Sequence, residues 1–310
     1  IEGLLMRGPH KTAIVCRKPG QEMVVKEEPN GTLSHGKWAR IPVVRGVVSF
    51  WDSMKFGMSA LMYSADFFDD GEPVEKGKFE AWLDRKLGEE KVEKLALGLA
   101  LAMGIGMPIV LFILLPTLLA GLVGDGMPSL LRNLMEGCIR ILIFLCFIWI
   151  TSRQSDVHRT YMYHGAEHKT IACYEAGKPL TVENIRPMTR FHPRCGTSFI
   201  FFVLFVSIIL FFFIQVSNPF ARLAVRILMI PVIAGISYEI IRLAGRTNNI
   251  FINILSAPGL MIQKLTTKEP TRDMVEVAIA SVEAVFDWKQ FLKDEFGWEE
   301  PVDEPSGQED

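Results

Sequence analysis

The segment LALGLALAMGIGMPIVLFILLPTLLAGLVG, residues 95–124, contains no charged side chain. A helix needs about 20 apolar residues to cross a bilayer, so a segment of this length predicts a membrane span. A second uncharged segment, FIFFVLFVSIILFFFIQV at 199–216, is also long enough to cross. The composition agrees, since 49% of all residues are hydrophobic although 22% are charged. These segments predict a mainly α-helical, polytopic membrane protein.

Two further segments, 134–151 and 223–243, predict spans although they contain charged residues. Inside a helix bundle such groups can pair or face a cavity, and those near helix ends can extend to the membrane surface. The resulting four spans form two hairpins, 95–152 and 199–243. The charged residues are Glu136 and Arg140 in the first of these segments, and Arg226, Glu239 and Arg242 in the second.

These charged residues allow two interpretations. Glu136 and Arg140 are four residues apart, which favours an ion pair within one helix, although an ion or proton pathway is an alternative. Glu239 lies near the end of its span and is a candidate for an intramembrane site or the surroundings of a nearby site. Its alternative is an ion pair with Arg242, three residues later.

The distribution of Lys and Arg predicts the orientation of the chain. These residues are frequent in 76–94 and 153–198, whereas the connection 125–133 has only Arg132. Because basic segments are retained in the cytoplasm, both termini and residues 153–198 are expected on the cytoplasmic side of the cell membrane. The lipid bilayer is therefore an expected partner, and a homo-oligomer stays open. The net charge of −2 argues against a nucleic acid partner.

The segments before the first span predict a small β element and two helices. Residues 1–43 form the β element, with two strands in 11–33 around the turn Lys18-Pro19-Gly20. In 44–66, apolar residues step by three and four, which predicts an amphipathic helix whose Met- and Trp-containing face contacts the membrane surface. A charged helix at 76–94 then leads into the span, so 44–94 is a cytoplasmic helical unit.

The segments after the last span are expected to lie outside the bundle. In 244–292, residues 247–266 mix apolar residues with Asn, Pro and Gly, which favours an interfacial or re-entrant element. A helix then begins after Thr271 and runs to about Leu292. The acidic tail at 293–310 is expected to be disordered.

The segment 153–198, between the two hairpins, contains a motif typical of metal sites. Residues 156–176 predict one helix with Ser155 or Asp156 as its cap and Gly177 as its stop. On this helix His164 and His168 lie one turn apart, so both imidazoles can bind one ion. Together with Glu167 they match the H-x-x-E-H pattern of inverzincin metalloproteases, in which the glutamate is the general base.

A second motif, HPRCGT at 192–197, supplies further metal ligands. His192 and Cys195 flank a proline and precede a glycine, which suits a tight loop. The five cysteines include no CxxC pair, so free thiols or metal ligation are expected and a disulfide is not. Zinc is the metal that these four donors favour, although another divalent ion stays open. Glu175 shares the face of His168 but lies about 10 Å along the helix, beyond direct ligation.

Six parts of the chain resemble a known family. They are IEGLLMRGP, SDVHRTYMYHGAEHKTIACYEAGKPLTVENIRP, HPRCGTSF, GISYEIIRLAG, PGLMIQKLTTKEP and VEVAIASVEAV. In these parts the sequence is similar to the YqhQ-like family of bacterial integral membrane proteins. The resemblance implies an inner-membrane protein of unknown function that is a predicted metal-dependent enzyme. It implies a site at His164, Glu167, His168, His192 and Cys195.

Three functions follow from these expectations. The first is a zinc hydrolase at the cytoplasmic face, acting on a membrane-protein segment or a lipid, with Glu167 as catalytic base. The second is a non-catalytic scaffold or membrane-protein assembly factor, in which His164, His168, His192 and Cys195 form a closed structural site. The third is a transporter that uses the charged residues of the spans. The number of protein ligands separates the first two functions.

Overall fold

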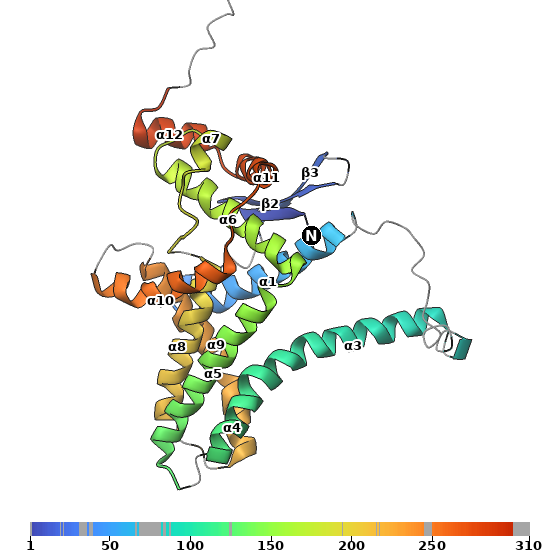
Figure 1. The fold of residues 1–310 in the computed structure, drawn as a ribbon, viewed down its shortest axis with the longest axis vertical. Helices are drawn as coiled ribbons and strands as arrows, with labels where there is room; N and C mark the ends of the chain where they lie inside the picture. The colour runs from blue at the N-terminus through green and yellow to red at the C-terminus, as the bar shows by residue number, and fades with distance from the viewer. Residues whose placement is uncertain are drawn as a thin grey trace, which may run out of the picture.

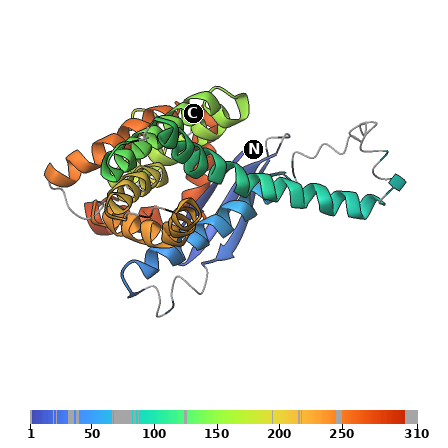
Figure 2. The same cartoon turned by 90° about the horizontal axis from the view of Figure 1, so that it is seen from below.

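A computed structural model gives the arrangement of the chain (Figure 1). It describes residues 2–18, 20, 22–30, 36, 40–65, 67, 82, 85–86, 88–123, 126–193, 195–214, 216, 218–244 and 250–299. Helices form a long bundle, and a small sheet with further helices covers one end of it (Figures 1 and 2). The predicted class, mainly helical with a small N-terminal β element, is therefore confirmed.

Within the described residues, four helical segments are long and apolar enough to cross a membrane. These are Lys94–Val123, Leu130–Thr151, Gly196–Phe213 and Phe220–Ala244. They correspond to the four predicted spans, and each begins slightly earlier than predicted. The second and fourth belong to α5 (Ser129–Thr151), whose N-cap is Pro128, and α9 (Pro219–Ala244), whose first residue is a proline, a residue that suits the start of a helix.

The first of these segments is one continuous helical stretch with a local widening. It consists of α3 (Glu89–Ile109), the π-helical turn η3 (Val110–Leu114) and α4 (Leu115–Val123). Pro116 has no N–H, so the carbonyl of Phe112 loses its α-helical partner. Arg140 of α5 donates its Nε–H to this carbonyl at 2.8 Å. The start of α3 points away from the bundle, whereas α4 packs against α5 (Figure 1).

The sheet is antiparallel with order β1-β2-β3, from β1 (Gly3–Arg7), β2 (Lys11–Arg17) and β3 (Met23–Pro29). The two strands predicted in 11–33 are confirmed as β2 and β3, whereas β1 lies in the predicted β element but was not identified as a strand. This strand is short and Leu/Met-rich, so little in its own sequence marks it as β structure. Its partner β2 is central and buried, and the pairing Leu5↔Ile14 sets the register.

The sheet shares one core with α6 (Ser155–Glu175), α7 (Val182–Ile185), α11 (Arg272–Glu283) and α12 (Trp288–Phe296). An ion pair and a hydrogen bond attach the N-terminal segment to these helices. Arg17 of β2 pairs with Glu276 of α11 at 3.0 Å, and Glu2 accepts a hydrogen bond from Tyr163 of α6 at 2.9 Å. The helix that carries both histidines is thus fixed by residues from each end of the chain.

Two C-terminal predictions need correction. The helix expected from Thr271 to about Leu292 is two helices, because the Asp287 side chain accepts the Gln290 N–H and starts α12 separately. The first residues of the predicted tail, from Lys293, belong to α12, which ends at Gly297 with a φ of 65°. Residues 300–310 lie outside the described part of the chain.

Helices α1 (Val44–Ala65) and α10 (Ile250–Thr266) lie across the same end of the bundle (Figure 1). The predicted helix at 44–66 is confirmed. It buries Asp52 and Phe56 towards the protein, whereas Trp51 and Met62, both 65% exposed, belong to an outward apolar stripe. Of the charged helix predicted at 76–94, the end from Glu89 belongs to α3, whereas residues 76–81, 83, 84 and 87 lie outside the described residues. The predicted interfacial element is a continuous helix, α10, that packs on α8 (Gly196–Phe213).

Candidate metal centre

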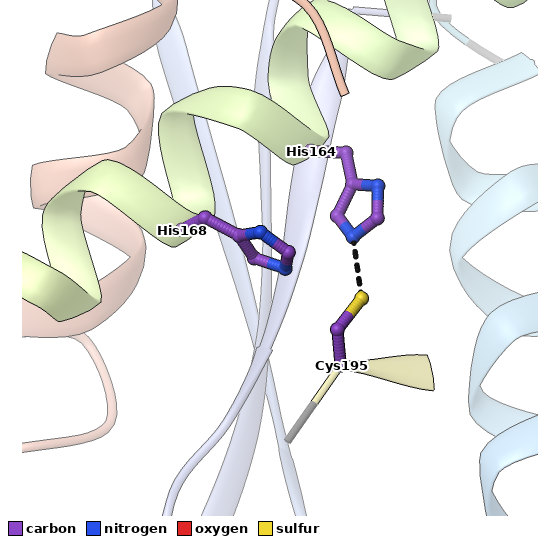
Figure 3. A group of neighbouring side chains, drawn as sticks. All are labelled: His164, His168 and Cys195. Atoms are coloured by element: carbon purple, nitrogen blue, oxygen red, sulfur yellow. Dashed lines mark hydrogen bonds between the residues drawn. The ribbon is translucent and has the colours of Figure 1, made fainter. Parts of the chain in front are cut away.

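The two histidines of α6 face the start of α8, where Cys195 is the N-cap residue (Figure 3). One ligand atom from each of His164, His168 and Cys195 lies within 4.8 Å of the other two. The Thr197 N–H donates to Cys195 Sγ at 3.4 Å, which fixes the thiol at the helix end. All five cysteines are free thiols, as predicted. Two segments 31 residues apart in the sequence therefore form one cluster.

Backbone carbonyls hold both imidazoles in one tautomer. His164 Nδ1 lies 2.9 Å from the Thr266 carbonyl oxygen, and His168 Nδ1 lies 2.6 Å from the Arg190 carbonyl oxygen. A carbonyl only accepts, so each Nδ1 carries the proton and each Nε2 keeps its lone pair. Outer hydrogen bonds of this kind orient histidine ligands in metal sites. The His164 Nε2 atom lies 3.1 Å from Cys195 Sγ.

Gly165 explains how the Thr266 carbonyl comes so close to His164. The chain leaving α10 runs directly over α6, where the Lys268 N–H donates to the Tyr161 carbonyl at 2.8 Å. A Cβ atom at Gly165 would lie 2.0 Å from the Lys268 carbonyl oxygen. A side chain at this position would therefore push the connection, and with it Thr266, away from the site.

Gln263 holds the HPRC loop on α10. Its side chain is fully buried, accepts the His192 N–H at 2.8 Å and donates to the His192 carbonyl at 2.7 Å. It also lies 3.0 Å from the Ser198 hydroxyl. Both ends of the loop that carries Cys195 are thus attached to one amide. Nothing in the sequence marked Gln263 or the carbonyls of Arg190 and Thr266, because any residue can supply a carbonyl.

His192 lies beside the cluster but does not join the three donors. Its ring centroid is 5.8 Å from that of His168, and its Nε2 is 3.3 Å from Glu175 Oε2. The structure therefore assembles His164, His168 and Cys195 and leaves His192 adjacent to them. Glu175 contacts this neighbouring histidine, in agreement with its predicted place beyond direct ligation.

Glu167 is half-buried on the same helix, one residue before His168. Burial raises the pKa of its carboxyl above the ordinary value, and positive charge on His164 or His192 opposes that rise. The carboxyl thus lies near enough to interact electrostatically with His164 of the cluster and with the adjacent His192. Burial favours the protonated form and the cluster favours the carboxylate, so the two effects act in opposite directions.

Glu269 connects the two segments that position His168. Its carboxylate pairs with Lys169 at 2.7 Å and with Arg190 at 2.9 Å. The hydrogen bond from Lys169 lowers the pKa of this carboxyl, and Arg190 adds to the effect. Lys169 follows His168 in α6, and Arg190 supplies the carbonyl that orients the His168 ring. Glu269 therefore keeps the His168 ring close to the Arg190 carbonyl that accepts its hydrogen bond.

The donor set fits zinc. Zinc bonds of about 2.0–2.3 Å in a tetrahedron place nitrogen and sulfur donors roughly 3.3–3.6 Å apart. His164 Nε2 and Cys195 Sγ are 3.1 Å apart, and all three donors lie within 4.8 Å of one another, so shifts of about an ångström would complete the geometry. His164 and His168 would bind through Nε2 and Cys195 through its thiolate. Three protein ligands leave one tetrahedral position for a fourth ligand.

The predicted pair Glu136–Arg140 lies elsewhere, inside the bundle. The carboxylate accepts Arg140 Nη2 at 2.9 Å, as predicted, and also Arg226 Nη2 of α9 at 2.7 Å. Arg140 further reaches Ser207 of α8 at 3.4 Å. The third member, Arg226, was recognised only as a charged residue in a span. This network joins α5, α8 and α9 and is separate from the metal cluster.

Glu239 pairs with Arg45 of α1, so its alternative interpretation, an ion pair with Arg242, was wrong. Its two carboxylate oxygens accept from the Arg45 guanidinium of α1, with Nε at 2.6 Å, and Oε1 also accepts the Val43 N–H at 3.2 Å. Val43 has a φ of 68°, which is unusual for a β-branched residue. Glu239 thus anchors the start of α1 on α9 and is not a member of the metal cluster.

The fold and the cluster define a helical-bundle protein with four helices of membrane-spanning length and a His/His/Cys site at one end, within the part of the chain that the structure describes. Residues 41–288 match the family described as protein of unknown function (DUF1385), so the chain belongs to that family. It is 31% identical over 294 residues to the uncharacterized protein YqhQ of Bacillus subtilis (strain 168), covering 91% of this chain and 88% of the relative. The predicted kinship is confirmed. No solved structure matches.

Proposed function

We propose that this protein is a metal-dependent hydrolase, most simply a zinc enzyme, embedded in the cell membrane with its site at the cytoplasmic face. The observation that carries the proposal is the set of three donors, in which each imidazole is fixed through Nδ1 to a backbone carbonyl so that its Nε2 can bind a metal beside Cys195. Sites with three protein ligands are typical of catalytic zinc, because the fourth position remains for water or substrate.

A zinc ion bound there would supply Lewis-acid chemistry, activating water at neutral pH. His164, His168 and Cys195 would hold the ion. Glu167, half-buried beside them, would accept a proton from the attacking water and return it to the leaving group. The carbonyls of Thr266 and Arg190 would keep the rings oriented through this proton movement. A membrane-protein segment or a lipid is the proposed substrate, since the site adjoins the spans.

The test combines metal analysis with a Glu167→Gln variant of the purified full chain. We expect one zinc per chain in both proteins, and a loss of hydrolysis of at least about 100-fold in the variant, because a general base contributes about 10²–10⁴-fold. The probes are a fluorescent phosphatidylglycerol in vesicles and a fluorescent apolar peptide. Glu183→Gln, at an exposed position of α7, is the matched control. Metal-free wild-type protein, or full activity in Glu167→Gln, would refute the proposal.

A structural site is the second candidate, and the position of His192 favours it. Its ring lies next to that of His168, so a ring shift away from Glu175 would bring it towards the cluster. Closed sites with four protein ligands are typical of structural zinc. X-ray absorption separates the two candidates: two nitrogens, one sulfur and one oxygen ligand support the hydrolase, whereas three nitrogens and one sulfur support a scaffold. His192→Ala should keep its metal in the first case and lose it in the second.

A further inference from the structure

An apolar cavity of about 280 Å³ lies inside the bundle, below the end that carries the metal cluster. Its volume is near the lower end of the ~300–1,000 Å³ typical of small-molecule pockets. It is bounded by α1, α5, α8 and α9 together with the η3 turn. Its α8 wall runs from Phe199 to Phe211, which is roughly 18 Å along the helix axis at 1.5 Å per residue. The cavity is therefore long enough for an extended chain.

The upper end of the cavity adjoins the metal cluster. Phe199 lines it one helical turn after Cys195, a separation of roughly 6 Å along the axis of α8. Phe50 of α1 covers this end, with its ring centroid 5.9 Å from that of Phe199. A molecule that fills the cavity would therefore have its upper end near Cys195 and beneath α1.

The lower end of the cavity offers no free charge to a ligand. Arg140, Ser207 and Arg226 line it, but the guanidinium groups are bound to Glu136, and Arg140 also reaches Ser207. Both guanidiniums also lie over the Phe211 ring, with centroid distances of 5.9 and 5.5 Å. An anionic group would have to displace Glu136 from this network. An uncharged apolar end fits the site as it stands.

We propose that this cavity holds one acyl chain of a membrane lipid, whose ester group then lies at the metal cluster. The inference rests on the proposed hydrolase function and names its substrate class. In the reaction, the water oxygen bonds to the acyl carbon and the acyl–oxygen bond breaks. The proton taken up by Glu167 passes to the leaving alcohol, and a fatty acid is released.

Photolabelling tests the cavity without requiring activity. The full chain is placed in vesicles of phosphatidylglycerol and phosphatidylethanolamine that contain phosphatidylglycerol with a diazirine at the end of one acyl chain. We expect label on peptides from 199–211 and 226–234. Val203→Phe fills the cavity and should lower this labelling at least fivefold. Val232→Phe, the same substitution at a position that is 37% exposed on α9, should leave it unchanged.

The outcomes separate the cavity from the hydrolase. Unchanged labelling in Val203→Phe would overturn the acyl-chain site, and so would displacement of the label by an apolar peptide but not by unlabelled lipid. Ala234→Leu narrows the same cavity more gently and replaces Val203→Phe if that variant elutes as an aggregate. If Val203→Phe lowers the labelling but the protein hydrolyses no ester, the acyl-chain site stands and the hydrolase is refuted. If the protein hydrolyses the ester but the cavity peptides are not labelled, the hydrolase stands and the acyl-chain site is refuted.

Discussion

At the residue scale, the HGAEH motif performs two different tasks. Its histidines supply the donors, whereas Gly165 lets the Lys268 carbonyl approach the helix between them. The sequence spacing predicted the shared face of His164 and His168, because helix periodicity is local. It gave no reason for the glycine, since the group that needs the space comes from a segment about a hundred residues later.

Gly165→Ala tests this close approach. The added methyl would meet the Lys268 carbonyl at 2.0 Å, so the connection between α10 and α11 must move. Overpacking of this kind costs about 1–3 kcal/mol, and we expect a lower Tm in detergent together with weaker zinc retention. Gly57→Ala is the control, since a Cβ there meets nothing within 4 Å. Equal Tm values for wild type and Gly165→Ala would show that the approach is not tight.

At the element scale, α1 is held on α9 by charge and by small residues. Gly46 faces Gly235, where an added Cβ would lie 2.9 Å from the opposite Cα, and Arg45 pairs with Glu239. The amphipathic pattern of α1 was visible in the sequence because it repeats within one helix. The partner of Glu239 was not, because the residue nearest in sequence, Arg242, is not the residue nearest in space.

Glu239→Gln and Arg45→Gln test this anchor. Each removes a two-point ion pair that is about one-quarter exposed, so we expect a lower Tm in detergent for both variants. The double variant should cost little more than either single variant, since both remove the same interaction. Arg242→Gln should be close to wild type. If Arg242→Gln lowered the Tm as much as Glu239→Gln does, the ion pair between Glu239 and Arg242 would have to be considered again.

At the scale of the whole molecule, α6 follows α5 of the bundle and packs in the unit that the sheet forms with α7, α11 and α12. The metal cluster lies at this junction, with two donors from the unit and one from the first residue of α8. The upper end of the apolar cavity lies one turn further along α8. A site between two layers of different polarity suits a substrate that has both an apolar and a polar part.

The proposed orientation can be tested with single cysteines and a membrane-impermeant maleimide. Met127→Cys, in the connection with few basic residues, should react in intact cells. Lys178→Cys, in the segment next to the metal cluster, should react only after the cells are opened. Wild-type protein, whose five thiols include three buried ones, sets the background. Labelling of Lys178→Cys in intact cells would place the cluster on the opposite side of the membrane.

The sequence by itself determined the four apolar helices, the histidine pair on one helix face and the family. Apolar length and helix periodicity are local properties, so they can be counted along the chain. Only the tertiary structure decided that Cys195 joins the histidines while His192 turns to Glu175, that Arg226 shares Glu136, and that Glu239 binds Arg45. These contacts depend on how separate helices pack. Each donor or charged group has many possible partners far away in the sequence, so the sequence alone does not select one.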